Sequence, residues 1–317
     1  MPADYSAEPI LCVRNMKQYF KVSSSFTVKA VDDVSFDIYP GETYGLVGES
    51  GSGKTTIGRG IIRLYDPTDG QITFKGKDIT GKLDRETFRL LRTKMQMIFQ
   101  DPMASLNPRK KIGDIIGEGL DIHKMYSTKE ERKQKIDRIL SMVGLASEHY
   151  DRYPYQFSGG QRQRVGIARA LIMNPELIIA DECISALDVS IQAQVVNLMK
   201  DIQEETGTAY LFIAHDLSMV KYISDRIGVL HLGRMLETGT TQEIFSRPLH
   251  PYTRSLLSAI PSPNPRTEKN RISMEYDYAT SGLNYDQGTL TKVEGTHFVH
   301  GTKAEIERWE QEMTPGA

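Results

Sequence analysis

The sequence has 317 residues but only two cysteines, Cys12 and Cys183, and a single tryptophan. Two cysteines so far apart argue against a disulfide framework and against a thiolate metal cluster. No apolar run reaches the roughly 18 residues of a membrane span, and the first thirty residues lack the basic-then-apolar profile of a secretion signal. A net charge of −2 offers no basic field to nucleic acid. These absences predict a soluble protein of the reducing cytoplasm that meets a membrane only through partners.

A glycine-rich stretch at residues 48–55, Gly-Glu-Ser-Gly-Ser-Gly-Lys-Thr, fits the phosphate-loop pattern. We expect a strand before it, over residues 42–47, and a helix that begins near Lys54 after it. Glycines let the backbone approach phosphates closely, so that its N–H groups face an anion at the helix N-terminus. Lys54 would reach the β- and γ-phosphates, and the Thr55 hydroxyl would ligate Mg²⁺. The residues predicted to hold the nucleotide are Gly48, Glu49, Ser50, Gly51, Ser52, Gly53, Lys54, Thr55 and Thr56.

Polar residues follow three further apolar runs that predict strands: Gln100, the pair Asp181 and Glu182, and His215. Open α/β sheets bind ligands at the carboxyl ends of their strands, so we expect these side chains beside Lys54. Asp181 is suited to hold Mg²⁺ through water, and Glu182 to accept a proton from an attacking water. Gln100 could reach the metal or a water, and His215 the γ-phosphate. Simple strand-end roles stay open for all four residues.

A second anion site is predicted where residues 157–164 open an amphipathic helix. Ser158 is a natural N-cap, and Gly159 and Gly160 bare the N–H groups of the first turn, followed by Gln161. One chain has one γ-phosphate to hold and already has a phosphate loop. The second site therefore predicts a role toward a nucleotide on another molecule.

Two other segments complete the pattern. Residues 101–109 contain two prolines and an Asn-Pro step, which predict an ordered loop rather than a helix. Phe20 lies 34 residues before Lys54, where an exposed aromatic could stack on adenine, with a strand position packed in the core as the alternative. Asp188 closes the stretch Ser185-Ala-Leu-Asp188 ahead of a long predicted helix that Gly207 ends.

In order and spacing, these motifs resemble the ATP-binding cassette of ABC transporters over about residues 10–245. Residues 99–109 and 250–257 are similar to the ATPase subunits of oligopeptide and dipeptide importers, whose relatives also take up nickel. The resemblance implies an α/β fold: a P-loop NTPase cassette with a RecA-like core sheet, an antiparallel β subdomain and a helical subdomain at about 101–170. It places a nucleotide-binding domain at 1–245 and a C-terminal extension at 246–317. The prolines at 261–265 predict a stiff linker, at 261–270, within that extension.

The resemblance also implies roles and partners. Phe20 would stack on adenine, Gln100 would sense Mg²⁺ and the transmembrane partner, and Ser158, Gly160 and Gln161 would clasp ATP on the opposite subunit. Asp188 would communicate across that dimer. The implied partners are a second ATPase subunit, usually a different chain, two membrane-spanning permeases and, indirectly, an extracytoplasmic peptide-binding protein. The chain would work with ATP and Mg²⁺ at the cytoplasmic face of the membrane, as a peripheral subunit.

The tail predicts a hairpin, with strands at 290–294 and 297–300, and a short helix opened by a capping box at Thr302 and Glu305. Some relatives hold an iron–sulfur cluster here on four cysteines. This chain has none after Cys183, so we expect no cluster. His297 and His300 are interpreted as residues of a hairpin surface rather than metal ligands.

Two alternatives and one departure remain. A soluble cassette ATPase of translation or DNA repair is disfavoured by the single cassette and by the short spacing of 58 positions from Gln100 to Ser158. A nucleotide-binding regulator without turnover is disfavoured by Glu182. Cys183 occupies a position where the family usually has Pro. It is either a small buried substitute or a change that loosens Glu182 and slows hydrolysis.

Overall fold

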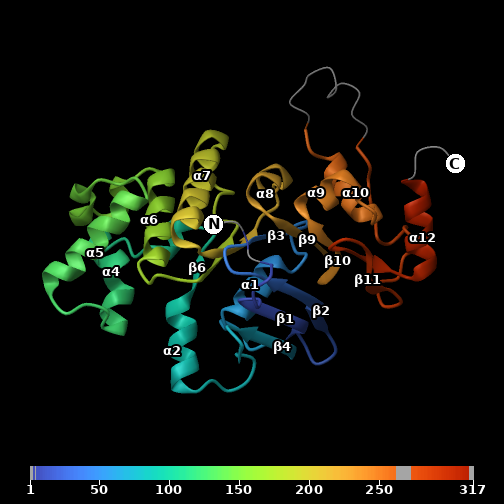
Figure 1. Cartoon of the computed structure of the whole chain (residues 1–317), viewed down its shortest axis with the longest axis horizontal. Coiled ribbons are helices and arrows are strands. Elements are labelled where there is room, and N and C mark those ends of the chain that lie inside the picture. The colour runs from blue at the N-terminus through green and yellow to red at the C-terminus, as the bar shows by residue number, and fades with distance from the viewer. Residues whose placement is uncertain (1–2, 4, 262–272, 314–317) are drawn as a thin grey trace.

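The computed structural model describes residues 3, 5–261 and 273–313, so the expected linker lies, apart from Pro261, outside the described residues. Two sheets organise this part of the chain (Figure 1). The strands in chain order are β1 (Leu11–Lys21), β2 (Thr27–Ile38), β3 (Thr43–Val47), β4 (Asp69–Phe74), β5 (Lys77–Asp78), β6 (Met95–Ile98), β7 (Leu177–Asp181), β8 (Ala209–Ile213), β9 (Arg226–His231), β10 (Arg234–Thr240), β11 (Thr289–Glu294) and β12 (His297–Gly301).

The larger sheet has the order β11-β12-β10-β9-β3-β8-β7-β6. The run from β9 to β6 is parallel, and β10, β12 and β11 continue it in antiparallel fashion. Every residue of β3, β7 and β8 is buried, as expected for parallel strands covered on both faces. The predicted α/β core sheet is therefore confirmed, and the carboxyl ends of β3, β6, β7 and β8 share one edge.

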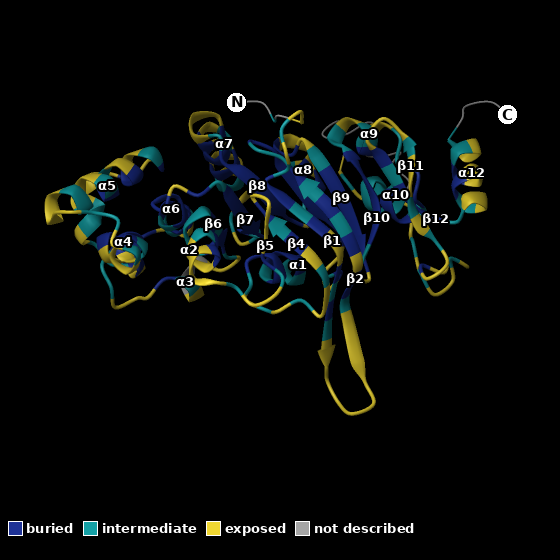
Figure 2. Ribbon diagram, turned by 60° about the horizontal axis from the view of Figure 1, so that its bottom comes forward, coloured by how far each residue is buried: buried dark blue, intermediate teal, exposed yellow. Residues whose placement is uncertain are grey.

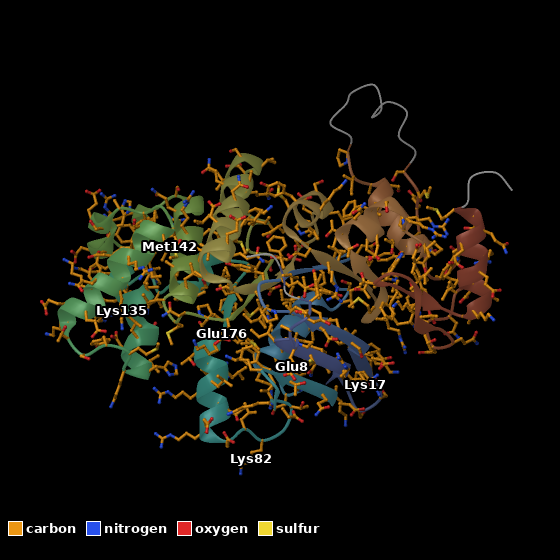
Figure 3. The ribbon with its side chains drawn as sticks, viewed as in Figure 1. Glu8, Lys17, Lys82, Lys135, Met142 and Glu176 are labelled. Atoms are coloured by element: carbon orange, nitrogen blue, oxygen red, sulfur yellow. The ribbon has the colours of Figure 1, made fainter. Side chains whose placement is uncertain are left out.

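The smaller sheet is antiparallel, with the order β2-β1-β4-β5. Its β1–β2 hairpin extends beyond the body of the protein with an exposed tip (Figure 2). An ion pair ties this sheet to the larger one: Lys75 Nζ, in the β4–β5 turn, lies 2.5 Å from a carboxylate oxygen of Glu176. Glu176 precedes β7 and is labelled in Figure 3. The expected antiparallel β subdomain is therefore present.

The helices are α1 (Lys54–Ile61), α2 (Arg85–Lys94), α3 (Pro102–Ser105), α4 (Ile112–His123), α5 (Lys129–Met142), α6 (Gly159–Leu171), α7 (Val189–Thr206), α8 (Leu217–Ile223), α9 (Thr241–Ser246), α10 (Pro251–Ser258) and α12 (Lys303–Glu312). Helices α4, α5 and α6 form a lobe on one side of the core sheet, the predicted helical subdomain (Figure 1). No helix in the described ranges is long and apolar enough to cross a membrane.

The short helix α3 corrects the expectation that residues 101–109 contain no helix. Pro102 begins it, and the first turn of a helix tolerates proline because its N–H groups have no intrahelical partner. The Asp101 side chain accepts a hydrogen bond from Ala104 N–H at 3.2 Å, which caps the turn. The prolines therefore limit this helix to four residues without preventing it.

The tail joins the core sheet instead of standing apart from it. Its predicted hairpin is confirmed as β11–β12, and β12 pairs with β10 through Glu237↔Val299 and Thr238↔Phe298. Helix α12 begins with the predicted capping box, and its Trp309 is buried. His297 and His300 are buried too, at 3% and 7% exposure, so their interpretation as surface residues is wrong. Because β12 pairs with β10 as well as with β11, its backbone groups are bonded on both sides instead of forming an exposed sheet edge.

Candidate nucleotide-binding and catalytic site

The phosphate loop connects β3 to α1, which begins at Lys54 as predicted. Its glycines are required by conformation: φ is 149° at Gly48, 82° at Gly51 and 105° at Gly53. A Cβ at Gly48 would lie 2.0 Å from the Leu230 carbonyl oxygen, and one at Gly53 would lie 2.3 Å from that of Ala30. The loop is therefore pressed against β9 on one side and β2 on the other, and its backbone forms a cradle of fixed shape.

Lys54 is buried inside this cradle at 4% exposure. Its ammonium donates hydrogen bonds to the carbonyl oxygens of Gly48 and Glu49, both at 2.8 Å, and to Ser52 Oγ at 3.3 Å. Burial lowers the pKa of Lys54, while the nearby Glu182 and Asp181 carboxylates oppose that shift. A buried cation that rests on backbone oxygens suits an incoming phosphate, which would supply the full negative charge that carbonyls lack.

Thr55 and Asp181 meet across the site, as their predicted shared role requires. The Thr55 hydroxyl donates a 2.7 Å hydrogen bond to Asp181 Oδ1 at the end of β7. Burial raises the pKa of Asp181, and the Thr55 hydrogen bond opposes that shift. A hydroxyl and a carboxylate in contact form the oxygen-rich donor set that Mg²⁺ prefers. These two residues therefore fit the metal that the fold family uses with its nucleotide.

Gln100, Glu182 and His215 also converge, although they belong to three different strand ends. Gln100 Nε2 donates to Glu182 Oε2 at 2.8 Å, and His215 Nδ1 lies 4.0 Å from the same oxygen. The Glu182 side chain is 17% exposed, whereas that of His215 is 58% exposed. One carboxylate thus lies between an amide and an imidazole and keeps access to solvent.

The backbone of Glu182 adopts a left-handed conformation, with φ of 45°, which is unusual for a residue with a side chain. Its N–H donates to the Ile213 carbonyl at 2.9 Å. Its carbonyl accepts from Ser185 N–H at 3.1 Å and from Ser185 Oγ at 2.9 Å. Strained residues of this kind concentrate at functional sites, where the surrounding structure holds them. Here the three backbone bonds direct the Glu182 carboxylate toward the site.

The second anion site has the predicted local structure. Ser158 caps α6, and a reciprocal pair of bonds links Ser158 with Gln161: Gln161 N–H to Ser158 Oγ at 3.3 Å and Ser158 N–H to Gln161 Oε1 at 3.0 Å. Ser158, Gly159 and Asp188 are exposed, and Asp188 stands at the N-cap position before α7 without a side-chain cap hydrogen bond. The exposed start of α6 contrasts with the buried Lys54, whose ammonium bonds to residues of its own loop.

The two neighbouring aromatic residues of β1 have different environments. The Tyr19 hydroxyl donates a hydrogen bond to Asp32 Oδ1 at 2.5 Å, and the residue is partly buried. Phe20 is 36% exposed and lies nearly perpendicular to the ring of Tyr65, with ring centroids 5.5 Å apart. Phe20 is thus accessible to solvent, and its role with adenine stays a prediction.

Two supports of the phosphate loop escaped the sequence analysis. Gly233, in the β9–β10 turn, donates its N–H to the Ser52 carbonyl at 3.0 Å. Tyr252, in α10, accepts a hydrogen bond from Glu49 N–H at its hydroxyl oxygen, at 3.0 Å. Both lie about 180 or more residues beyond the loop in sequence, and neither belongs to a phosphate-binding pattern. These two hydrogen bonds become apparent only in the folded chain, where the end of β9 and the start of α10 lie against the phosphate loop.

Residues 31–185 match the family described as ABC transporter, and residues 236–281 match the one described as "Oligopeptide/dipeptide transporter, C-terminal region". The oligopeptide transport ATP-binding protein OppF of Bacillus subtilis (strain 168) is 59% identical over 301 residues, covering 94% of this chain and 98% of OppF. The dipeptide transport ATP-binding protein DppF of Lactococcus lactis subsp. cremoris (strain MG1363) is 53% identical over 304 residues, covering 95% and 97%.

Solved structures agree with the fold. The chain is similar to the ATP-binding cassette MJ0796 in its dimeric structure, with a TM-score of 0.66 and 30% identity over 73% of this chain and 98% of that one. MJ0796 has also been solved as a dimer in a post-hydrolysis state bound to ADP and Pi, with a TM-score of 0.66 and 29% identity. The fold, the phosphate loop and these matches define the class: this protein is an ATPase of the ABC transporter family.

Within that class the match at residues 236–281 and the identities above narrow the assignment. The chain belongs to the family of oligopeptide and dipeptide transport ATP-binding proteins. The resemblance inferred from residues 99–109 and 250–257 is confirmed.

Proposed function

We propose that this chain hydrolyses ATP at the site formed by the phosphate loop, Asp181, Glu182, Gln100 and His215, and that hydrolysis powers import of oligopeptides or dipeptides. One observation carries the proposal: the side chains of Gln100 and His215 both approach the same carboxylate oxygen of Glu182. Glu182 acts as the general base toward the attacking water. Gln100 holds the carboxylate in place, and His215 contacts the γ-phosphate. The names of OppF and DppF support the peptide as solute.

Positioning and charge neutralisation are the main requirements of phosphoryl transfer. The buried Lys54 ammonium and the loop N–H groups bind and orient the β- and γ-phosphates. Thr55 and Asp181 would hold Mg²⁺, Asp181 through water, with Gln100 near the same ion; the metal supplies neutralisation of the phosphate charge. The phosphate loop cannot by itself enclose the γ-phosphate, so hydrolysis by a single chain is slow.

The remaining half of the enclosure comes from a second ATPase subunit, which we propose to be a different chain. The exposed Ser158 and Gly159 at the start of α6, with Gly160 and Gln161, face a nucleotide bound to that subunit, and Asp188 lies at the contact between the two. The dimeric MJ0796 structures support this arrangement. ATP then joins the two subunits and hydrolysis releases them, which makes a nucleotide-driven switch.

A groove between the core and the helical lobe is the proposed contact with two membrane-spanning permease subunits. It has a volume of 860 Å³, and its walls include the exposed apolar side chains of Leu64, Phe88 and Ile122. Gln100 and Asp101 line the same groove, so one residue touches both the groove and Glu182. Movement of the segment 100–109 would therefore transmit the state of the nucleotide to the permeases at the cytoplasmic face of the membrane.

Replacement Glu182→Gln tests the catalytic assignment. It preserves size and the contact with Gln100 but removes the base, so we expect at least a hundredfold loss of turnover with ATP binding retained. Steady-state ATPase and nucleotide affinity should be measured on the chain assembled with its partners. Turnover within threefold of wild type would contradict the role of Glu182 and would favour a different base.

The groove is tested separately with Phe88→Asp and Ile122→Asp. Both side chains are at least half exposed, so the changes leave the fold and nucleotide binding intact while they disfavour an apolar partner. We expect loss of peptide uptake and of co-purification with the permeases. Tyr222→Asp, at an exposed position outside this groove, is the matched control and should keep both. Normal uptake by the groove variants would place the permease contact elsewhere.

A further inference from the structure

The peptide group between Gly48 and Glu49 is held from both of its ends. Its carbonyl oxygen accepts the Lys54 ammonium at 2.8 Å, and its N–H donates to the Tyr252 hydroxyl at 3.0 Å. In a planar trans peptide these two groups point in opposite directions. Lys54 therefore attaches to one side of the peptide and Tyr252 to the other, and each bond resists the rotation that would break its counterpart.

We propose that Tyr252 is a positioning residue of the nucleotide site, through which the C-terminal part of the chain takes part in nucleotide binding. It fixes the orientation of the Gly48–Glu49 peptide and thereby the place from which Lys54 reaches the phosphates. When a phosphate draws the ammonium away from the Gly48 carbonyl, Tyr252 keeps the peptide from turning with it. The inference rests on the proposed assignment of nucleotide binding to residues 48–55.

Tyr252 can do this because its own position is fixed by a buried carboxylate. Glu237 is fully buried in β10 and accepts hydrogen bonds from Leu249 N–H at 2.8 Å and His250 N–H at 3.0 Å. His297, from the tail hairpin, adds a 2.7 Å bond to the same carboxylate. His250 then caps α10 by accepting from Tyr252 N–H at 3.1 Å. The start of α10 is thus tied to β10 and β12 before it touches the loop.

The ring of Tyr252 is fixed as well. It is fully buried and stacks on the imidazole of His231, with centroids 4.2 Å apart. The imidazole is in turn held by the Tyr285 hydroxyl at 2.8 Å, which also bonds to the Tyr276 hydroxyl at 2.9 Å. His231 ends β9, two residues before Gly233, whose N–H supports the loop at Ser52. Gly233 and Tyr252 therefore bond to the phosphate loop at two separate points. Tyr276 and Tyr285 pack against the side chains of Tyr252 and His231 that hold these points in place.

The experiment compares full-length wild type with Tyr252→Phe, which removes one oxygen atom and keeps the ring. We expect the Kd for MgADP to rise about fivefold, because a net hydrogen bond contributes about 1 kcal/mol. Amide exchange at Glu49 should accelerate in the same variant. The matched control is Tyr44→Phe, which also deletes a fully buried hydroxyl, one bonded to Thr238 Oγ1 at 2.8 Å away from the loop. It should lower the melting temperature similarly and leave the Kd unchanged.

Lys54→Ala separates the two levels of the argument. If Lys54→Ala loses MgADP binding while Tyr252→Phe binds as wild type, the role of Tyr252 is overturned and the site assignment stands. The role is equally overturned if Tyr44→Phe weakens binding as much as Tyr252→Phe does. If Lys54→Ala binds MgADP as tightly as wild type, the assignment of the site to residues 48–55 is itself wrong.

Discussion

Two polar clusters lie next to each other in this protein and are built on opposite principles. In the nucleotide site Lys54 rests on backbone carbonyls, and the Glu182 carboxylate has one amide donor and an imidazole 4.0 Å away. The second cluster, the tail cluster, is centred on Glu237 of β10 and includes His297 of the tail hairpin. Here Glu237 accepts three hydrogen bonds, from two backbone N–H groups and from His297. The first cluster leaves charge for a ligand to neutralise, whereas the second satisfies its charge internally.

This contrast teaches how to separate function from support. Buried polar groups whose hydrogen bonds are all made within the protein stabilise one conformation, so removing such a group lowers the free energy of unfolding. Groups that keep unused charge do little for the fold and are available for chemistry. Tyr252 joins the two clusters, since it lies in α10, whose N-cap residue His250 bonds to Glu237, and its hydroxyl accepts a hydrogen bond from the phosphate loop.

The largest effect is expected from Glu237→Ala, which should damage the fold and spare the chemistry. It leaves three buried donors without an acceptor, so we expect the free energy of unfolding to fall by about 3 kcal/mol. Urea unfolding measures this. In contrast, Glu182→Gln should leave the free energy of unfolding within about 0.5 kcal/mol of wild type. The comparison fails if both variants lose similar stability.

A smaller effect should appear on acidification, through His231. Burial lowers the pKa of His231 to about 4, in a pocket walled by the rings of Tyr252, Tyr276, Tyr278 and Tyr285. The unfolded chain takes up this proton near pH 6.5, before the folded one does. The stability that neutral, buried His231 provides is therefore fully present at neutral pH and is lost as the pH falls from 6.5 to 4. Between pH 7 and pH 5 we expect the free energy of unfolding to fall by about 2 kcal/mol on this account.

The measurement needs a matched variant, because other buried groups titrate in the same range. His250 has its pKa lowered to about 3 by burial and by the nearby His300, His231 and Arg254, which adds to the effect. Glu42 has its pKa raised to about 7 by burial and acts in the opposite direction. Urea unfolding of wild type and His231→Gln at both pH values isolates His231. An identical pH dependence of the two proteins would contradict the prediction.

The smallest effect is expected at Cys183, the departure from the family pattern. Cys183 is buried, and burial raises the pKa of its thiol to about 12, so it acts as a small apolar side chain. The backbone of Glu182 is already fixed by Ile213 and Ser185. Cys183→Pro should therefore change kcat by less than twofold in an ATPase assay. A larger gain would show that the cysteine loosens the catalytic carboxylate.

Much of the nucleotide site could be predicted from the sequence because its parts are short and local. The phosphate loop is one consecutive stretch, and the other residues each end an apolar strand. Parallel strands deliver their carboxyl ends to a common edge, so strand order hardly matters for bringing Thr55 to Asp181 or Gln100 to Glu182. The helix start at Ser158 was equally local, since a capping box spans only four residues.

What the sequence could not reveal is long-range contact. It indicated the tail hairpin but not that β12 would pair with β10 and bury His297 and His300. It marked residues 250–257 as typical of a family without indicating that Tyr252 touches the loop. Such contacts depend on which faces of distant elements meet, and no periodicity records that.

By itself, then, the sequence indicated the residues of the site: a lysine among glycines, carboxylates at strand ends, and a capped helix start at Ser158. The tertiary structure decided what holds that chemistry in place. It placed β9, β10, α10 and the tail behind the phosphate loop, where Gly233 and Tyr252 bind backbone groups that every residue carries. A backbone N–H looks the same at every position, so only the folded chain can show which one needs a partner.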